Sequence, residues 1–204
     1  MRSVTRALLL DYGCVLSLPQ PPDAVRALES VAPDVAPADF WRGYWDVRLA
    51  YDEGMADDVY LASVLGREPT AAEVGRFVEL DTAGWLHLEE RMTGVLPGLH
   101  ERGVPVGLLS NAPFPLARAL ERQPWAKAFT SLTFSADLGI AKPRPEAYLA
   151  AARALGAEPA AVVFVDDRAE NVAAADAVGM TGVHHTDVAE TLALLDRLLQ
   201  TGDS

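Results

Sequence analysis

The sequence of 204 residues contains one cysteine, Cys14, and no long apolar segment. A single cysteine cannot form a disulfide within the chain, so a packed core has to hold the fold together. The apolar run near the N-terminus is short and is interrupted by Asp11, which argues against a signal peptide or a membrane helix. These absences predict a cytoplasmic protein with no membrane partner.

Basic residues are also scarce. The chain has 17 of them against 29 acidic residues, a formal net charge of −12, and only Lys127 and Lys142 are lysines. This excess of negative charge opposes binding to nucleic acid or to an anionic membrane, and it favours a small-molecule ligand. Hydrophobic residues make up 50% of the chain, which is enough for a substantial core.

Four short apolar runs predict buried parallel strands, and a weaker run predicts a fifth. The four cover residues 7–10, 104–109, 132–134 and 162–165, and the fifth covers 182–185. Helical patterns separate most of them, such as 143–157, which begins with prolines and ends at Gly156. This alternation predicts an α/β fold with a doubly wound parallel sheet.

Residues 17–92 break the alternation, because only helical patterns occur there. The expected helices span 23–31, 37–51, 56–66 and 70–92. The same region holds 15 acidic and six basic residues, a net charge of −9, so most of the acidity of the chain belongs to it. We therefore predict a core domain of residues 1–16 and 93–204, with an all-helical domain of residues 17–92 inserted after the first strand.

Polar side chains follow the predicted strands at the edge where an open α/β sheet binds its ligand. They are Asp11, Ser110 with Asn111, Lys142, and Asp166 with Asp167. Carboxylates can hold Mg²⁺, a hydroxyl and an amide can bind phosphoryl oxygens, and a lysine can neutralise the remaining charge. A carboxylate at such a site can also attack phosphorus and form an aspartyl-phosphate.

Four motifs in order resemble those of the haloacid dehalogenase (HAD) superfamily. They read LLLDYG around Asp11, GLLSN around Ser110, GIAKPRPEAY around Lys142, and VVFVDDRAENVAAADAVGM around Asp166 and Asp167. The helical insertion is similar to the cap domain of many members. The first motif, D-x-G, is similar to that of the phosphatase-like branch with a small helical cap. The resemblance implies a Rossmann-like core and a Mg²⁺-dependent hydrolase acting on a small phosphorylated metabolite.

The resemblance also implies roles for individual residues. Asp11 would be the nucleophile and a metal ligand, and Gly13 would offer its backbone carbonyl to the metal. Ser110 and Asn111 would hold the phosphoryl oxygens, and Lys142 would tie Asp11 to the phosphate. Asp167 matches the usual metal ligand of the last motif, with Asp166 as a less definite one. Asn171 takes the place of the family's second acid there and offers an amide instead.

Gly13 departs from the pattern of the family's phosphatases, which usually have a second aspartate at this position. That aspartate protonates the leaving group and then activates water, and glycine can do neither. General acid–base catalysis contributes about 10²–10⁴ in rate. The sequence therefore predicts slow hydrolysis of alkyl phosphates, with anomeric, acyl and aryl phosphates affected least.

Two alternatives stay open. A 2-haloacid dehalogenase would use Asp11 on carbon and would not need Mg²⁺, although Asp166 and Asp167 argue against it. A degenerate relative could bind phosphate or accept a phosphoryl group without turnover, because of Gly13. The sequence does not indicate the substrate or the oligomeric state.

Other conspicuous residues receive structural interpretations. We expect Cys14 to pack as a small apolar residue, and His184 and His185 to be structural or to lie at the rim of the site. Four aromatic residues lie at roughly helical spacing in the insertion, and we expect them to pack in its core, with a substrate-facing wall as the alternative. These are Trp41, Tyr44, Trp45 and Tyr51.

Overall fold

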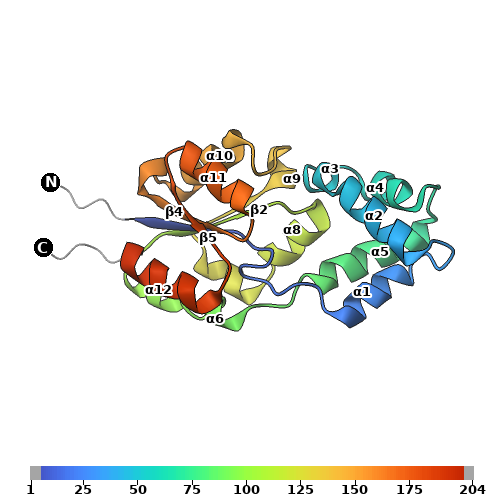
Figure 1. Cartoon of the computed structure of the whole chain (residues 1–204), viewed down its shortest axis with the longest axis horizontal. Helices are drawn as coiled ribbons and strands as arrows, with labels where there is room; N and C mark the ends of the chain where they lie inside the picture. The colour runs from blue at the N-terminus through green and yellow to red at the C-terminus, as the bar shows by residue number, and fades with distance from the viewer. Residues whose placement is uncertain (1–5, 200–204) are drawn as a thin grey trace, which may run out of the picture.

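The computed structural model describes residues 6–199, and within this range five strands form one parallel sheet (Figure 1). The strands are β1 (Ala7–Leu10), β2 (Val106–Ser110), β3 (Ser131–Phe134), β4 (Val162–Asp166) and β5 (Thr181–His184), in the order β3-β2-β1-β4-β5. β1 lies at the centre, where Leu9 is opposite Gly107 on one side and Phe164 on the other. The predicted doubly wound α/β fold is confirmed.

Helices cover both faces of the sheet, because the strands present apolar side chains on both of them. Leu8 and Leu10 point into one hydrophobic cluster, whereas Leu9 points into a second cluster on the opposite face. The first cluster packs against α6 (Glu90–Thr93), α7 (Leu96–Glu101), α8 (Phe114–Glu121) and α12 (Val188–Leu199). The second packs against α10 (Pro145–Leu155) and α11 (Ala169–Ala177), which lie above the sheet in Figure 1. Short helices α9 (Ser135–Leu138), η1 (Pro124–Ala128) and η2 (Pro159–Ala161) lie in the connections.

Helix α10 illustrates how local sequence sets the boundaries. Pro145 occupies the first turn, where no hydrogen bond from its nitrogen is needed, and Gly156 follows the last residue with a φ of 72°. This left-handed conformation is easy for glycine and ends the helix where the sequence predicts.

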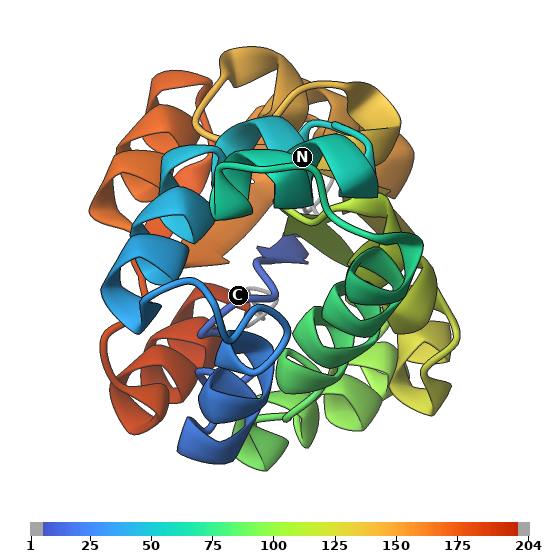
Figure 2. The same cartoon turned by 90° about the vertical axis from the view of Figure 1, so that its right-hand side faces the viewer.

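Five further helices form a separate lobe next to the sheet. They are α1 (Pro22–Glu29), α2 (Pro37–Asp46), α3 (Arg48–Asp52), α4 (Asp57–Leu65) and α5 (Ala71–Gly84). The lobe has its own hydrophobic cluster, in which Phe40, Tyr60 and Phe77 are fully buried. Gly43 lets α2 approach α4 closely, because a Cβ there would lie 2.7 Å from the carbonyl oxygen of Val64. Figure 2 shows these helices, blue to green, in front of the sheet and around the end of β1.

Two predicted helices of the lobe are longer than the observed ones. The helix expected over 37–51 is interrupted at Val47, whose φ and ψ of −113° and 7° are not helical. The helix expected over 70–92 begins with a Thr70–Glu73 capping box and ends at Gly84.

The chain leaves and re-enters the sheet domain through two paired segments. Ser17 forms an isolated antiparallel bridge with Leu88, and the Leu18 N–H donates to the His87 carbonyl at 2.6 Å. Met92 is fully buried in the cluster beneath the sheet. The division of the chain into a core domain of residues 1–16 and 93–204 and an inserted domain of residues 17–92 stays a proposal. No helix within 6–199 has the length and apolar composition needed to cross a bilayer.

Candidate active site

Asp11 follows β1 directly and is held rigidly at the end of the sheet. Its N–H donates to the Val165 carbonyl at 2.9 Å, which continues the pairing with β4 by one residue. Its Oδ1 accepts a hydrogen bond from the Tyr12 N–H at 2.7 Å and lies 2.7 Å from Lys142 Nζ. The residue is only 7% exposed. Because these two donors fix Oδ1, the carboxylate has a defined orientation, and Oδ2 is the oxygen that they do not hold.

The loop after Asp11 turns sharply. The Tyr12 carbonyl accepts from the N–H groups of Leu16 and Ser17, each at 2.9 Å, and Cys14 has a φ of 55°. Burial raises the pKa of the Cys14 thiol to about 11, and nearby carboxylates add to the rise. A thiol that stays protonated at neutral pH is a poor nucleophile, in line with the expectation that Cys14 does no chemistry.

Lys142 joins Asp11 to the last motif. Its Nζ lies 2.7 Å from Asp11 Oδ1 and 2.7 Å from Asp166 Oδ2, and all three side chains are buried. Burial alone would lower the pKa of Lys142, but the two carboxylates hold it above its usual value. Burial raises the pKa of Asp11 to about 7 against the lowering effect of Lys142, and Asp166 adds to the rise.

Asp166 is completely buried and accepts several hydrogen bonds. Besides Lys142, the Arg168 N–H donates to its Oδ1 at 2.9 Å, and the Asn171 amide donates to both oxygens at 2.9 and 3.1 Å. The amide that replaces an acid at Asn171 therefore fixes a neighbouring carboxylate. Asn171 Oδ1 is also buried and has no hydrogen-bond partner.

Three carboxylates converge at this point of the sheet. Oxygens of Asp11, Asp166 and Asp167 lie within 4.8 Å of one another. Asp167 is half-buried, and both burial and the Asp166 charge raise its pKa. Its backbone carbonyl lies 2.9 Å from His184 Nε2, so His184 supports the loop from the rim as expected. Three carboxylates that converge in this way suit a divalent cation, which prefers oxygen ligands.

The side chains of Ser110 and Asn111, at the end of β2, make different contacts. Ser110 is the last residue of the strand and is buried, facing the same cleft as Asp11. The Asn111 side chain instead braces the Lys142 segment: its amide donates to the Lys142 carbonyl at 2.9 Å and its oxygen accepts from the Lys142 N–H at 2.8 Å. The Asn111 side chain therefore positions Lys142.

A cleft of about 530 Å³ lies between the sheet and the lobe. Of the predicted site residues, all except Asp166 line it: Asp11, Gly13, Ser110, Asn111, Lys142 and Asp167. The lobe and its return segment contribute Trp45, for which a place in the wall was the alternative interpretation of the sequence. They also contribute four residues that the sequence did not assign to the site, Arg48, Leu49, Asp52 and Trp85. The Tyr12 hydroxyl donates to the Trp85 carbonyl at 2.7 Å and ties the two walls together.

The expectation of core packing is wrong for one of the four aromatic residues. Tyr44 and Tyr51 are buried in the lobe core, and Trp41 is half-buried against it. Trp45 is 56% exposed and lines the cleft. The reason is that Trp45 directly follows Tyr44 on α2, so the two side chains point about 100° apart and only Tyr44 reaches the core.

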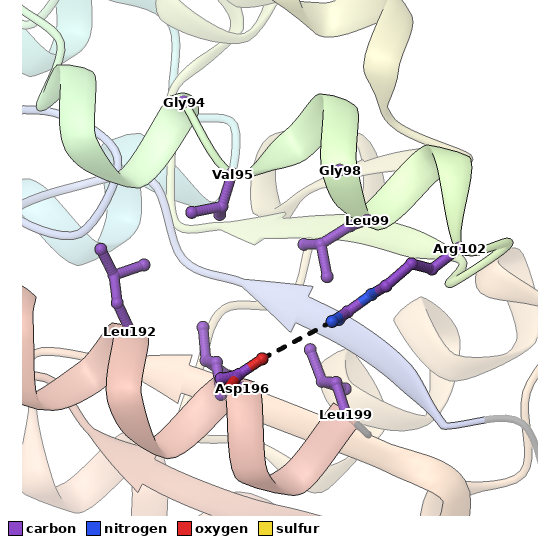
Figure 3. A pocket seen from close by; sticks show the side chains of 9 residues that line it. Gly94, Val95, Gly98, Leu99, Arg102, Leu192, Asp196 and Leu199 are labelled. Carbon is purple, nitrogen blue, oxygen red and sulfur yellow. Dashed lines mark ion pairs between the residues drawn. The ribbon is translucent and has the colours of Figure 1, made fainter. Parts of the chain in front are cut away.

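A second hollow, of about 300 Å³, shares no lining residue with this cleft. Figure 3 shows Val95 and Leu99 on one side and Leu192 and Leu199 on the other. An Arg102–Asp196 ion pair of 3.6 Å crosses it. None of the predicted site residues lines this hollow, so the cleft around Asp11 is the candidate active site.

The parallel sheet, the helical lobe after its first strand and the Asp11–Lys142–Asp166 cluster are the arrangement expected for the haloacid dehalogenase class of proteins. The sequence model of the haloacid dehalogenase-like hydrolases matches residues 21–179. The chain belongs to this family.

Curated relatives include phosphatases. The chain is 37% identical over 119 residues to the sesquiterpene phosphatase AstK of Aspergillus oryzae, which covers 58% of this chain and 61% of that protein. It is 37% identical over 89 residues to the phosphoglycolate phosphatase of Salmonella paratyphi A, covering 43% of this chain and 35% of that one. Each alignment thus spans less than two thirds of the relative.

Solved structures share the fold over nearly the whole chain. A HAD family enzyme from Bacteroides thetaiotaomicron superposes with a TM-score of 0.75 at 19% identity, covering 94% of this chain and 98% of that one. A HAD-like hydrolase from Porphyromonas gingivalis has the same TM-score at 17% identity, with 98% and 100% covered.

Proposed function

We propose that this protein is a Mg²⁺-dependent phosphatase that hydrolyses a small phosphate monoester through an aspartyl-phosphate on Asp11. The observation that carries the proposal is the oriented Asp11 carboxylate, which shares Lys142 with Asp166 at a point where three carboxylates meet. Two curated relatives are phosphatases, and a structure of the Bacteroides enzyme holds magnesium and inorganic phosphate.

The residues present fit a magnesium ion. Asp11 and Asp167 would ligate it, together with the Gly13 carbonyl, because oxygen ligands suit this cation. Asp166 is the less definite ligand, since its oxygens already accept hydrogen bonds from Lys142 and Asn171. The unpartnered oxygen of Asn171 would accept a hydrogen bond from water at the site. When bound, Mg²⁺ supplies neutralisation of the charge on the phosphoryl oxygens.

The two chemical steps follow from the orientation of Asp11. Its Oδ2 attacks phosphorus, the bond between phosphorus and the ester oxygen breaks, and the alcohol leaves after taking a proton from solvent. Water then attacks the phosphorus of the aspartyl-phosphate, and the bond to Asp11 breaks to release inorganic phosphate. Lys142, Ser110 and the Asn111 N–H would hold the phosphoryl oxygens in both steps.

The proposal is tested by measuring phosphate release with Mg²⁺ and with EDTA across a panel of phosphate monoesters. We expect metal-dependent release that is lost in Asp11→Asn, a change that keeps the shape of the side chain and removes the nucleophile. Release that persists in Asp11→Asn would refute the nucleophile assignment. Release from no ester at all, with retained phosphate binding, would favour a phosphate-binding protein instead.

A further inference from the structure

The wall of the cleft that belongs to the lobe is apolar and solvent-exposed. Trp45 and Leu49, four residues apart, are 56% and 54% exposed and line the cleft that contains Asp11. Trp85 and Leu116 line the same cleft. Large apolar side chains left in water next to a reactive centre indicate a surface that is covered when a ligand binds.

The cation nearest to this wall is already neutralised. Arg48 is buried, and its Nε donates to Asp52 Oδ1 at 2.9 Å while its Nη1 donates to Asp81 Oδ2 at 3.2 Å. Its guanidinium also lies 5.0 Å from the centre of the Tyr44 ring. Two carboxylates surround one guanidinium, so this cluster does not attract a second anion into the cleft.

The other two cationic side chains that line the cleft also form ion pairs with carboxylates. Lys142 lies between Asp11 and Asp166, and the exposed Arg168 pairs with Glu170. Each cation among the described lining residues therefore has at least one carboxylate partner. A ligand with a carboxylate or a second phosphate would meet apolar side chains and acids on the lobe side.

We propose that the substrate carries one phosphate and an uncharged, apolar organic group, which packs against Trp45 and Leu49. This inference rests on the proposed phosphatase function and names the class of ester. The phosphate occupies the end near Asp11 and Lys142, and the organic group extends along the lobe wall. A cleft of about 530 Å³ has room for a group of ring size or larger beside the phosphate.

Two aryl esters of similar size separate the two chemistries. We would compare 4-isopropylphenyl phosphate with 4-carboxyphenyl phosphate, which differ in whether the end remote from phosphorus is apolar or charged. We expect a kcat/KM at least tenfold higher for the isopropyl ester. A kcat/KM for the carboxyl ester that is equal or higher would overturn the inference.

Variants of the wall locate the preference. Trp45→Ala and Leu49→Ala should each raise KM for the isopropyl ester about three- to tenfold with little change in kcat, because they remove apolar contact without touching the phosphate end. Val59→Ala is the matched control, since Val59 is 51% exposed on α4 of the same lobe and does not line this cleft. Leu49→Lys should improve the carboxyl ester. Unchanged KM values in all three wall variants would refute the role of this wall.

Binding separates this inference from the proposed function. Both esters would be titrated by calorimetry into Asp11→Asn, in which the nucleophile is absent. Tighter binding of the isopropyl ester supports the inference even if the wild type releases no phosphate. If Asp11-dependent release occurs and the two esters bind equally, the phosphatase function stands and the inference fails.

Discussion

Gly13→Asp should accelerate the hydrolysis of alkyl phosphates. Gly13 lines the cleft beside Asp11, and a Cβ added to it would meet no atom within 4 Å. Its φ also lies outside the left-handed region, so an aspartate can be introduced there without backbone strain. The change supplies the carboxylate that phosphatases of this family usually have at this position.

The magnitude follows from what a general acid contributes. Proton transfer to the leaving group is worth about 10²–10⁴ in rate, or roughly 3–5 kcal/mol of activation free energy. An alkoxide needs this proton, whereas nitrophenolate is stable without it. We therefore expect kcat on an alkyl phosphate to rise by about 10² or more in Gly13→Asp, with a much smaller rise on 4-nitrophenyl phosphate.

The assay is steady-state phosphate release with Mg²⁺ for wild type, Gly13→Asp and Gly13→Asn. The asparagine variant has nearly the same shape but cannot donate a proton as a carboxylic acid, so it controls for packing. Equal wild-type rates on the alkyl and nitrophenyl esters would refute the reasoning. An equal gain in both variants would refute it as well.

Three further predictions concern the metal, the lobe and a helix start. Burial raises the pKa of Asp11 to about 7, so protons compete with Mg²⁺ for this carboxylate. The Kd for Mg²⁺, measured by calorimetry, should therefore increase as the pH falls from 8 to 6, and a constant Kd would contradict this. Asp81→Asn should lower the free energy of unfolding by about 1–3 kcal/mol in urea, because the buried Arg48 loses one of its partners, while the exposed Asp46→Asn should have little effect. Thr70→Ala should cost about 1 kcal/mol by the same measurement, since it removes the capping box of α5, and no loss would show that this cap does not stabilise the lobe.

The sheet and the residues at its edge could be predicted from sequence because each depends on a local pattern. Apolar runs marked all five strands, with ends that shift by a residue or two, as at β2, which extends to Ser110. The parallel order then brings the ends of β1 and β4 together, which places Asp11 near Asp166. The strands and the residues at their ends could therefore be predicted without knowing how the helices pack.

The lobe wall of the cleft could not be predicted in the same way. Tyr44 and Trp45 are neighbours on α2, so their side chains point about 100° apart, and the packing of the lobe decides that Tyr44 lies in the core while Trp45 lines the cleft. The pairing of Arg48 with Asp81 joins residues 33 positions apart. Such contacts depend on how the helices pack, and no local periodicity records them.

The hydrogen bonds around Asp166 and Asp167 could not be predicted from the sequence either. The sequence alone left open how Asp166 and Asp167 divide their roles. In the structure Asp166 is saturated by Lys142, Asn171 and the Arg168 N–H, whereas Asp167 faces the cleft. Both acids follow the same strand, so only the three-dimensional arrangement distinguishes them.

The covalent state of Asp11 during turnover tests the central claim most directly. Wild-type protein would be mixed with an aryl phosphate and Mg²⁺, quenched in acid within the first turnovers, digested and analysed by mass spectrometry. Because Gly13 cannot activate the water of the second step, the aspartyl-phosphate should accumulate, and the peptide containing Asp11 should gain the mass of one phosphoryl group. Rapid phosphate release with no phosphoryl group on that peptide would contradict the account.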